Sequence, residues 1–189
     1  MTDQLLFPGM EAARPLTDSL FFAVVPDAPT RTRIGAITHE LRDKYALTGK
    51  PLAERLHISL HGIGEFPSFP KDIAALAIEA AASVALPPFE ITFDRVMSFS
   101  GKAGQLPLVL LGEGTEGVAA LRQALGGALA KAGLAARQST PHLTLLYVAR
   151  RVDEQPITRI GWTMREFVLV HSLLGQARYI PLGKWPLRG

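Results

Sequence analysis

The chain has 189 residues, of which 48% are apolar and 20% charged, and its formal net charge is +3. This balance suits a globular protein of one domain or two small lobes with a sizeable core, and it excludes a disordered acidic or basic tail. The chain has no cysteine, which excludes disulfides, thiolate zinc sites and cysteine nucleophiles.

The N-terminal segment, residues 1–17, carries Pro8, Gly9 and Pro15 without sustained periodicity, and we expect it to form an arm that precedes the fold. It lacks the charged region and the long apolar stretch of a signal peptide. No part of the chain approaches the roughly 18 apolar residues that a membrane span needs. Together with the absence of cysteine, these features indicate a cytoplasmic protein.

The first half of the chain predicts two strands and two helices. A short apolar run at residues 20–25 stops at Pro26 and is typical of a buried strand. Apolar residues three or four apart predict a helix over residues 30–45. A second strand at residues 56–63 and an Ala-rich helix at residues 71–84 follow.

The second half repeats the same kinds of element. The pattern predicts two strands, a helix, a further strand and a final hairpin, at residues 89–100, 106–111, 116–132, 142–148 and 167–182. Each half therefore contains a strand, a helix and a second strand with a similar local pattern. This arrangement suggests an internal duplication.

A histidine stands two residues before a hydroxyl side chain in one predicted strand of each half. The two motifs are His57-Ile58-Ser59-Leu60 and His142-Leu143-Thr144-Leu145. Because side chains at i and i+2 share one face of a strand, each histidine projects with the hydroxyl of its own motif. The apolar residues between them would anchor each strand in the core. The same alternation adds Arg55 and His61 to the first polar face and Thr140 to the second.

If the two polar faces line a common cleft, a bound phosphorus has an imidazole on either side and a hydroxyl beside each imidazole. A neutral histidine then takes a proton from water while a protonated one gives a proton to the leaving ribose oxygen. Each role contributes roughly 10² to 10⁴ in rate, and histidine suits both because its ordinary pKa is about 6.5. This is the chemistry that hydrolysis of a cyclic phosphodiester needs.

The residues can be assigned to roles on this basis. The hydroxyls of Ser59 and Thr144 would bind the non-bridging phosphate oxygens, and no metal is required. We take His142 as the base toward water and His57 as the acid toward the leaving oxygen. The sequence alone also allows the reverse assignment.

The two motifs resemble the paired His-x-Thr/Ser-x motifs of the two-histidine phosphoesterases, specifically the RNA 2′,3′-cyclic phosphodiesterase or 2′-5′ RNA ligase family. The separation of 85 positions between the histidines (142 minus 57) looks typical of that family. Leu20–Val24 resembles the family's opening strand, Glu54–Leu56 resembles its approach to the first motif, and Pro141 resembles its lead into the second. The resemblance covers roughly residues 18–187.

The resemblance implies an α+β fold with a bilobal, pseudo-twofold duplication, in which two antiparallel sheets with flanking helices face a central cleft. It implies a single domain over residues 18–187. Family members open 2′,3′-cyclic phosphate ends of RNA, and some join RNA ends weakly through a 2′-5′ linkage. We therefore expect a cyclic phosphodiesterase that acts on RNA ends or small cyclic nucleotides, with no cofactor and as a monomer.

The chain departs from the family at one place. Several members carry an arginine just after the second motif, where this chain has Leu146 and Tyr147. The charge of the phosphate must then be met elsewhere, and we expect Arg55 and Arg137, with Tyr147, to contact the substrate.

Other interpretations stay open. The chain could be a non-catalytic RNA-end binding module, or both motif histidines could be structural strand residues. Residues 112–117 match G-x-G-x-x-G between a predicted strand and helix, which would suit a dinucleotide-binding oxidoreductase, although Glu113 and Glu116 would then face the pyrophosphate. Phe66 and Phe69 would either stack on a nucleobase or pack in the core. His61 is expected in the cleft or a loop.

Overall fold

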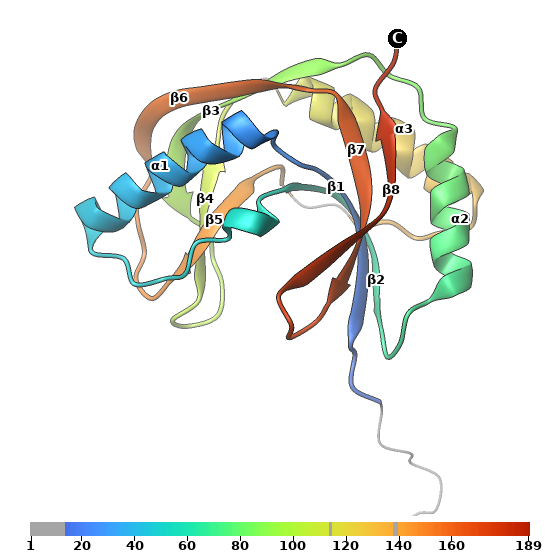
Figure 1. The fold of residues 1–189 in the computed structure, drawn as a ribbon, viewed down its shortest axis with the longest axis horizontal. Helices are drawn as coiled ribbons and strands as arrows, with labels where there is room; N and C mark the ends of the chain where they lie inside the picture. The colour runs from blue at the N-terminus through green and yellow to red at the C-terminus, as the bar shows by residue number, and fades with distance from the viewer. Residues whose placement is uncertain (1–13, 114, 138–139) are drawn as a thin grey trace, which may run out of the picture.

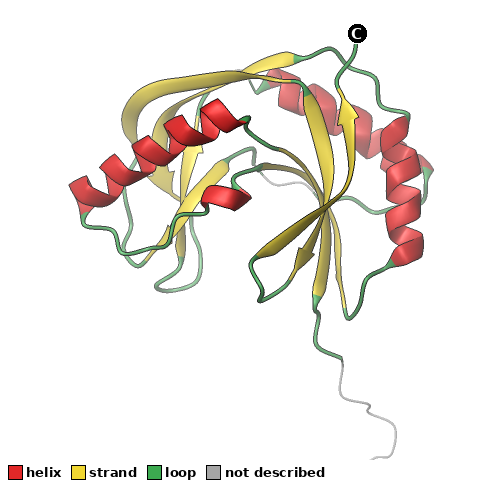
Figure 2. Ribbon diagram, viewed as in Figure 1, coloured by secondary structure: helices red, strands yellow, loops and turns green. Residues whose placement is uncertain are grey.

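The computed structural model of the protein describes residues 14–113, 115–137 and 140–189. Most of the expected N-terminal arm lies outside the described residues. Within them the chain forms a mixed structure of helices around antiparallel strands, so the predicted α+β class is confirmed (Figures 1 and 2). None of the described helices is long and apolar enough to cross a membrane.

The elements follow the predicted order, with one addition. The first half contains β1 (Asp18–Val24), α1 (Ala28–Tyr45), the short 3₁₀-helix η1 (Ala53–Arg55), β2 (Ile58–Phe66) and α2 (Lys71–Ala82). The second half contains β3 (Phe89–Ser98), β4 (Leu106–Leu111), α3 (Glu116–Lys131), β5 (Leu143–Val148), β6 (Gln155–Met164), β7 (Glu166–Leu173) and β8 (Arg178–Pro186). The sequence pattern does not predict β6. It is an edge strand, and it buries apolar side chains only in its second half, at Ile160, Trp162 and Met164.

The helices begin and end where local chemistry favours it. Asp27 is the N-cap of α1, and its carboxylate accepts a hydrogen bond from the backbone N–H of Thr30 at 2.8 Å. Pro29 occupies the first turn of the same helix, where its missing N–H costs nothing. Helix α3 is followed by Gly133, whose φ of +76° is the left-handed conformation that glycine adopts readily.

The strands form one eight-stranded antiparallel sheet in the order β6-β3-β4-β5-β2-β1-β7-β8. The order reads the same in both halves, with the motif strands β5 and β2 innermost and the later strands outside. The two halves join where β2 pairs with β5 at a single residue pair, Ile58 with Leu143. The prediction of two separate sheets is therefore corrected to one sheet with a seam, because this single pair connects what would otherwise be two four-stranded sheets.

The helices also join the two halves, because each of two helices packs on the strands of the other half. Helix α1 follows β1 but lies against β6, where the Arg33 guanidinium donates to the Gly161 carbonyl at 2.8 Å. Helix α3 follows β4 but packs against β2, beside α2 (Figure 1). The exchange ties the two motif strands to both halves of the molecule.

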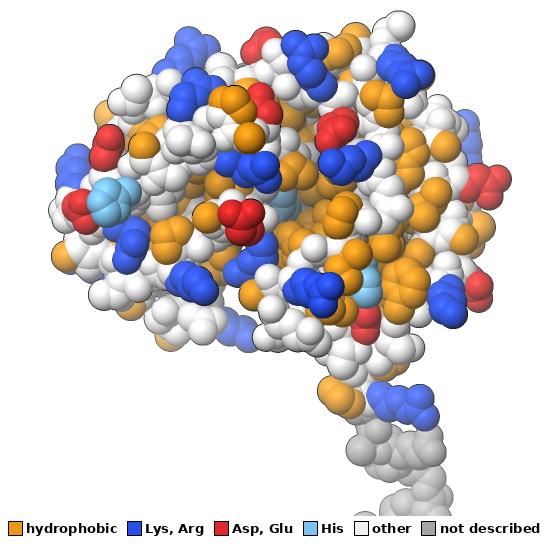
Figure 3. Space-filling model, in the orientation of Figure 1, with side chains coloured by type: hydrophobic (Ala, Val, Ile, Leu, Met, Phe, Trp, Pro, Cys, Tyr) orange, Lys and Arg blue, Asp and Glu red, His pale blue; other side chains and the backbone are white. Residues whose placement is uncertain are grey.

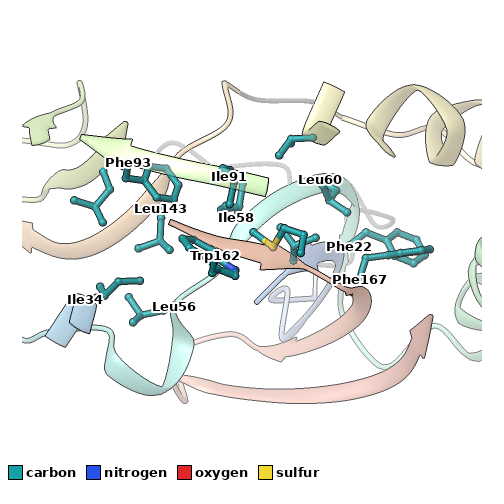
Figure 4. Close-up of a cluster of buried hydrophobic side chains, with 14 of the residues drawn as sticks. Phe22, Ile34, Leu56, Ile58, Leu60, Ile91, Phe93, Leu143, Trp162 and Phe167 are labelled. Atoms are coloured by element: carbon teal, nitrogen blue, oxygen red, sulfur yellow. The ribbon is translucent and has the colours of Figure 1, made fainter. Parts of the chain in front are cut away.

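A single apolar cluster extends through both halves and includes the middle residues of the two motifs. Ile58 and Leu143 are fully buried in it, as Figure 4 shows together with Ile91, Phe93 and Trp162. Their burial confirms that the apolar residue between histidine and hydroxyl anchors each motif. The polar residues on either side must therefore face away from this cluster.

Candidate functional site

The two motifs meet at the seam between β2 and β5. Ile58 pairs with Leu143, so in this antiparallel register His57 lies opposite Thr144, and Ser59 lies opposite His142. Directly opposed residues have Cβ atoms roughly 4.5 to 5.5 Å apart, and diagonal neighbours such as the two histidines are about 7 to 8 Å apart in a regular ladder. The four polar residues thus form a square with imidazoles on one diagonal and hydroxyls on the other.

Both imidazoles are held in the same way. The Nδ1 atom of His57 lies 2.7 Å from the Arg55 carbonyl oxygen, and the Nδ1 atom of His142 lies 2.6 Å from the Thr140 carbonyl oxygen. Because a carbonyl only accepts, each Nδ1 must carry a hydrogen and donate. The Nε2 atom of each ring is then left to accept or donate a proton, which is the arrangement that acid–base chemistry requires.

Aromatic rings surround the two imidazoles unequally. The His57 ring centroid lies 5.0 Å from that of Phe21 and 5.6 Å from that of Tyr179, whereas Phe99 lies 5.1 Å from His142. Burial lowers the pKa of His57 below its ordinary 6.5, and the charge of the nearby His142 adds to this effect, although the bond to the Arg55 carbonyl opposes it. His57 is therefore the imidazole that is harder to protonate than an exposed histidine.

A β-bulge follows each motif and changes which residues share its face. Ser59 pairs with Ala23 while His61 pairs with Phe22, so Leu60 is the extra residue in β2. In β5 the register shifts in the same way after Thr144, at Leu145. Simple alternation fails beyond these bulges.

The bulges exchange the positions predicted for two residues. His61 was expected in the cleft, and this is wrong, because the bulge turns it to the helix side, where it is 1% exposed and packs against α3 at Gly126. Tyr147 lies three residues after Thr144, yet the bulge returns it to the polar face, where it is 50% exposed. The position after the second motif thus does face the site.

A buried arginine lies behind the first motif. Arg122 of α3 is 6% exposed, and its Nη2 donates to the carbonyl of Ser59 at 2.6 Å. The Nε2 of His61 lies 2.8 Å from the Arg122 carbonyl. Two buried nitrogens, Nδ1 of His61 and Nε of Arg122, have no partner among the described residues. Burial lowers the pKa of both side chains. Arg122 therefore fixes the edge of β2 at the seam.

A cavity of about 600 Å³ opens beside His57. Its lining comes from the η1 segment, the start of α1, the β6–β7 turn and the outer strands β7 and β8, and includes Arg55, Tyr179, Val168 and Trp162. Figure 3 shows the hollowed face, with a histidine at its centre and lysine and arginine side chains around it. His142 is not among the described residues that line it, so the cavity extends the site in one direction only.

Comparisons with known proteins agree with this geometry. A protein-family model described as the 2′-5′ RNA ligase superfamily matches residues 25–173. The chain belongs to this superfamily. Among solved structures, E. coli LigT in its apo form is 25% identical with a TM-score of 0.72, and the match covers 93% of this chain and 100% of that one.

Two further structures resemble this superfamily member. A crystal structure described as a phosphoesterase is 25% identical, with a TM-score of 0.69, over 93% of this chain and 100% of that one. The protein TT0787 of Thermus thermophilus is 24% identical, with a TM-score of 0.66, over 90% of this chain and 98% of that one. The search of curated proteins gives no significant match. The superfamily and these structures support an enzyme that acts on phosphate esters.

The three expected substrate contacts differ in position within this superfamily member. Arg55 lines the cavity beside His57, with its Cζ 5.7 Å from the ring centroid of Tyr179. The Tyr147 phenol lies near that of Tyr179, so a side chain of the second half approaches the first. Arg137 is exposed, and its backbone pairs with Gly62, five residues along β2 from His57. The structure thus brings Arg55 and Tyr147 toward the site, whereas Arg137 is not among the cavity residues.

Two other sequence hypotheses find different explanations. The glycine-rich turn at residues 112–117 joins β4 to α3, but β4 is antiparallel to both its neighbours, which is not the parallel unit of a dinucleotide fold. Its glycines permit close packing, because a Cβ at Gly112 would come within 1.9 Å of the Thr92 carbonyl oxygen. Phe69 lies 4.8 Å from the ring of His171, a histidine paired with Asp18, and neither lines the cavity.

Sequence reasoning did not find the aromatic residues that flank His57. The pattern places Phe21 only within a buried strand, and Tyr179 only within a hairpin. Both reach the site because β2, β1, β7 and β8 are neighbours in the sheet. A half-buried aromatic that alternates with the fully buried Leu20 and Phe22 was the available signal. No group of three metal-binding side chains occurs in the part of the chain that the structure describes.

Proposed function

We propose that this superfamily member hydrolyses 2′,3′-cyclic phosphodiesters at RNA ends or in small cyclic nucleotides, with His57 and His142 as a metal-independent acid–base pair. The observation that supports this most is the matched anchoring of the two imidazoles. Each Nδ1 is engaged by the carbonyl two residues earlier, at 2.7 Å and 2.6 Å. The same tautomer therefore leaves both Nε2 atoms available at one seam.

The proposed reaction follows from the square of polar residues. Nε2 of His142 accepts a proton from water, and the water oxygen forms a bond to phosphorus. The bond between phosphorus and one ribose oxygen breaks, and Nε2–H of His57 donates its proton to that oxygen. The hydroxyls of Ser59 and Thr144 donate to the non-bridging oxygens as their charge changes. The proton that His57 gives up is balanced by the one that His142 gains.

The cavity supports this division of roles. The nucleoside is the bulky part of the substrate, and the space for it opens beside His57 rather than beside His142. The ribose oxygen that leaves would then lie on the His57 side, and water would approach from the His142 side. Joining RNA ends through a 2′-5′ linkage is the reverse reaction, and it would exchange the two roles.

Known ligands of a relative are consistent with a phosphate-binding site. E. coli LigT has been crystallised with phosphate and with NADP+, at 25% and 26% identity to this chain. Phosphate is the group placed between the histidines in the proposed reaction. NADP+ carries several phosphates and two nucleosides, which indicates that a cleft of this kind accepts extended ligands.

Hydrolysis of an oligonucleotide with a 2′,3′-cyclic phosphate end, in excess EDTA, tests the proposal. We expect full activity of the unaltered protein and a loss of at least roughly a hundredfold in His57→Ala and in His142→Ala. His39→Ala is a matched control, because His39 is exposed on α1 away from the seam. Full activity in either site variant would refute the paired mechanism, and loss of activity in EDTA would indicate a metal. An unaltered protein that binds the RNA end without turnover would be a binding module.

A further inference from the structure

The cavity beside His57 extends well beyond the space that one cyclic phosphate needs. Across the sheet, Ser59 pairs with Ala23, Ala23 with Val168, and Val168 with Lys184. All four therefore lie in one row on the same face. Three steps between strands, each of 4.7 to 4.9 Å, place Lys184 roughly 14 Å from Ser59. The cavity is thus long enough to hold more of a substrate than its reacting end.

The floor of this cavity is apolar. Ala23, Val168 and Val170 form a second buried cluster, separate from the main core, with Phe21 and Tyr179 packed against it. This cluster lies on the sheet face that carries Ser59, since Val168 shares its row. An apolar surface bordered by aromatic rings is the kind of platform on which single-stranded nucleic acids stack their bases.

The far side of the cavity is basic, with carboxylates that are already engaged. Glu166 pairs with Lys184 at 3.5 Å, and Asp27 accepts the N–H of Thr30 as the cap of α1. Arg31 and Arg165 also line the cavity, and within the described residues neither has a carboxylate oxygen within 4.0 Å of its nitrogens. Two guanidinium groups are therefore free to bind an anion.

We propose that Arg31 and Arg165 bind a phosphate of the RNA backbone upstream of the cyclic end, and that the apolar floor between them and His57 holds a base. The inference rests on the proposed function for the position of the cyclic end. It makes an RNA oligonucleotide, rather than a cyclic mononucleotide, the preferred substrate. Arg55 lies between the two positions, beside Tyr179. The contacts are to backbone and base faces, so they select chain length rather than sequence.

The test compares a cyclic mononucleotide with a trinucleotide that ends in a 2′,3′-cyclic phosphate, using kcat/KM. We expect the unaltered protein to prefer the trinucleotide. The double variant Arg31→Ala/Arg165→Ala should lower the ratio of the two values roughly tenfold, at about threefold for each exposed ion pair. Arg151→Ala is the matched control, since this exposed arginine pairs with Asp153 away from the cavity. It should leave the ratio unchanged.

Binding separates this inference from the proposed reaction. Fluorescence anisotropy of a labelled trinucleotide ending in a 2′-phosphate reports affinity without turnover. Its dependence on salt should weaken by about 0.7 in log–log slope for each phosphate contact that the variants remove. Equal effects on mononucleotide and trinucleotide, or an unchanged slope, would overturn the subsite. Absence of hydrolysis with a normal loss of binding would instead overturn the proposed reaction and leave the subsite supported.

Discussion

Replacement of Arg122 by methionine separates a positioning role from a stabilising one. The Arg122 guanidinium donates to the Ser59 carbonyl at 2.6 Å, is buried, and has an unpartnered Nε. No carboxylate of the described residues lies within 4.0 Å of it. Methionine keeps an unbranched chain that fills the same space. The substitution therefore removes one hydrogen bond and one uncompensated buried charge.

The two effects on stability oppose each other. Loss of a hydrogen bond to a charged group costs about 1.5 to 3 kcal/mol. Removal of a buried ion without a partner returns a desolvation penalty of several kcal/mol. We expect the free energy of unfolding of Arg122→Met to change by less than about 1 kcal/mol or to rise. Turnover should nevertheless fall roughly ten- to a hundredfold, because the edge of β2 that carries Ser59 is no longer held in place.

Urea unfolding and kcat on a cyclic-phosphate oligonucleotide measure the two effects separately. Arg122→Lys keeps a donor and the charge, so it should recover part of the turnover. The reasoning is refuted if Arg122→Met loses more than about 3 kcal/mol of stability while turnover of the folded protein is unchanged. That outcome would make Arg122 a structural group with no influence on the site.

Three further predictions concern the histidines and the hydroxyls. Burial lowers the pKa of His57 and His61, so the unfolded chain takes up protons that the folded chain does not, and the melting temperature should fall as pH drops below 6.5; a flat profile would contradict this. If His57 is the acid, kcat/KM should decline with rising pH at a value below 6.5, and an alkaline limb above 7 would exclude this assignment. Thr144→Ala should lower kcat roughly a hundredfold, whereas Thr144→Ser should keep most of it; equal activities would show that the hydroxyl does not contact the phosphate.

The two motifs and most elements could be predicted from sequence because they depend on local pattern. Residues that share a strand face are two apart, and the helical stripes repeat every three or four residues. Burial of Ile58 and Leu143 confirms this for the residues nearest each histidine. Local pattern also places His57 with Ser59 and His142 with Thr144 without knowledge of the sheet.

The parts that were missed depend on pairing between distant strands. A bulge is defined by the partner strand, so nothing in Leu60-His61-Gly62 shows that His61 turns inward. The same holds for Tyr147, which the bulge at Leu145 returns to the polar face. Tyr179 lies 122 residues after His57 (179 minus 57), and only the order β2-β1-β7-β8 brings the two rings together. The cavity and its basic side arise from the same long-range order.

The central claim is that one phosphate lies between His57 and His142. Nitrogen-15 NMR of histidine-labelled protein, titrated with inorganic phosphate, tests it without requiring turnover, with resonances assigned through the two His→Ala variants. We predict that the Nε2 signals of both residues shift together with one dissociation constant, and that either variant weakens phosphate binding at the other histidine. A shift confined to one histidine, or two independent dissociation constants, would contradict the account.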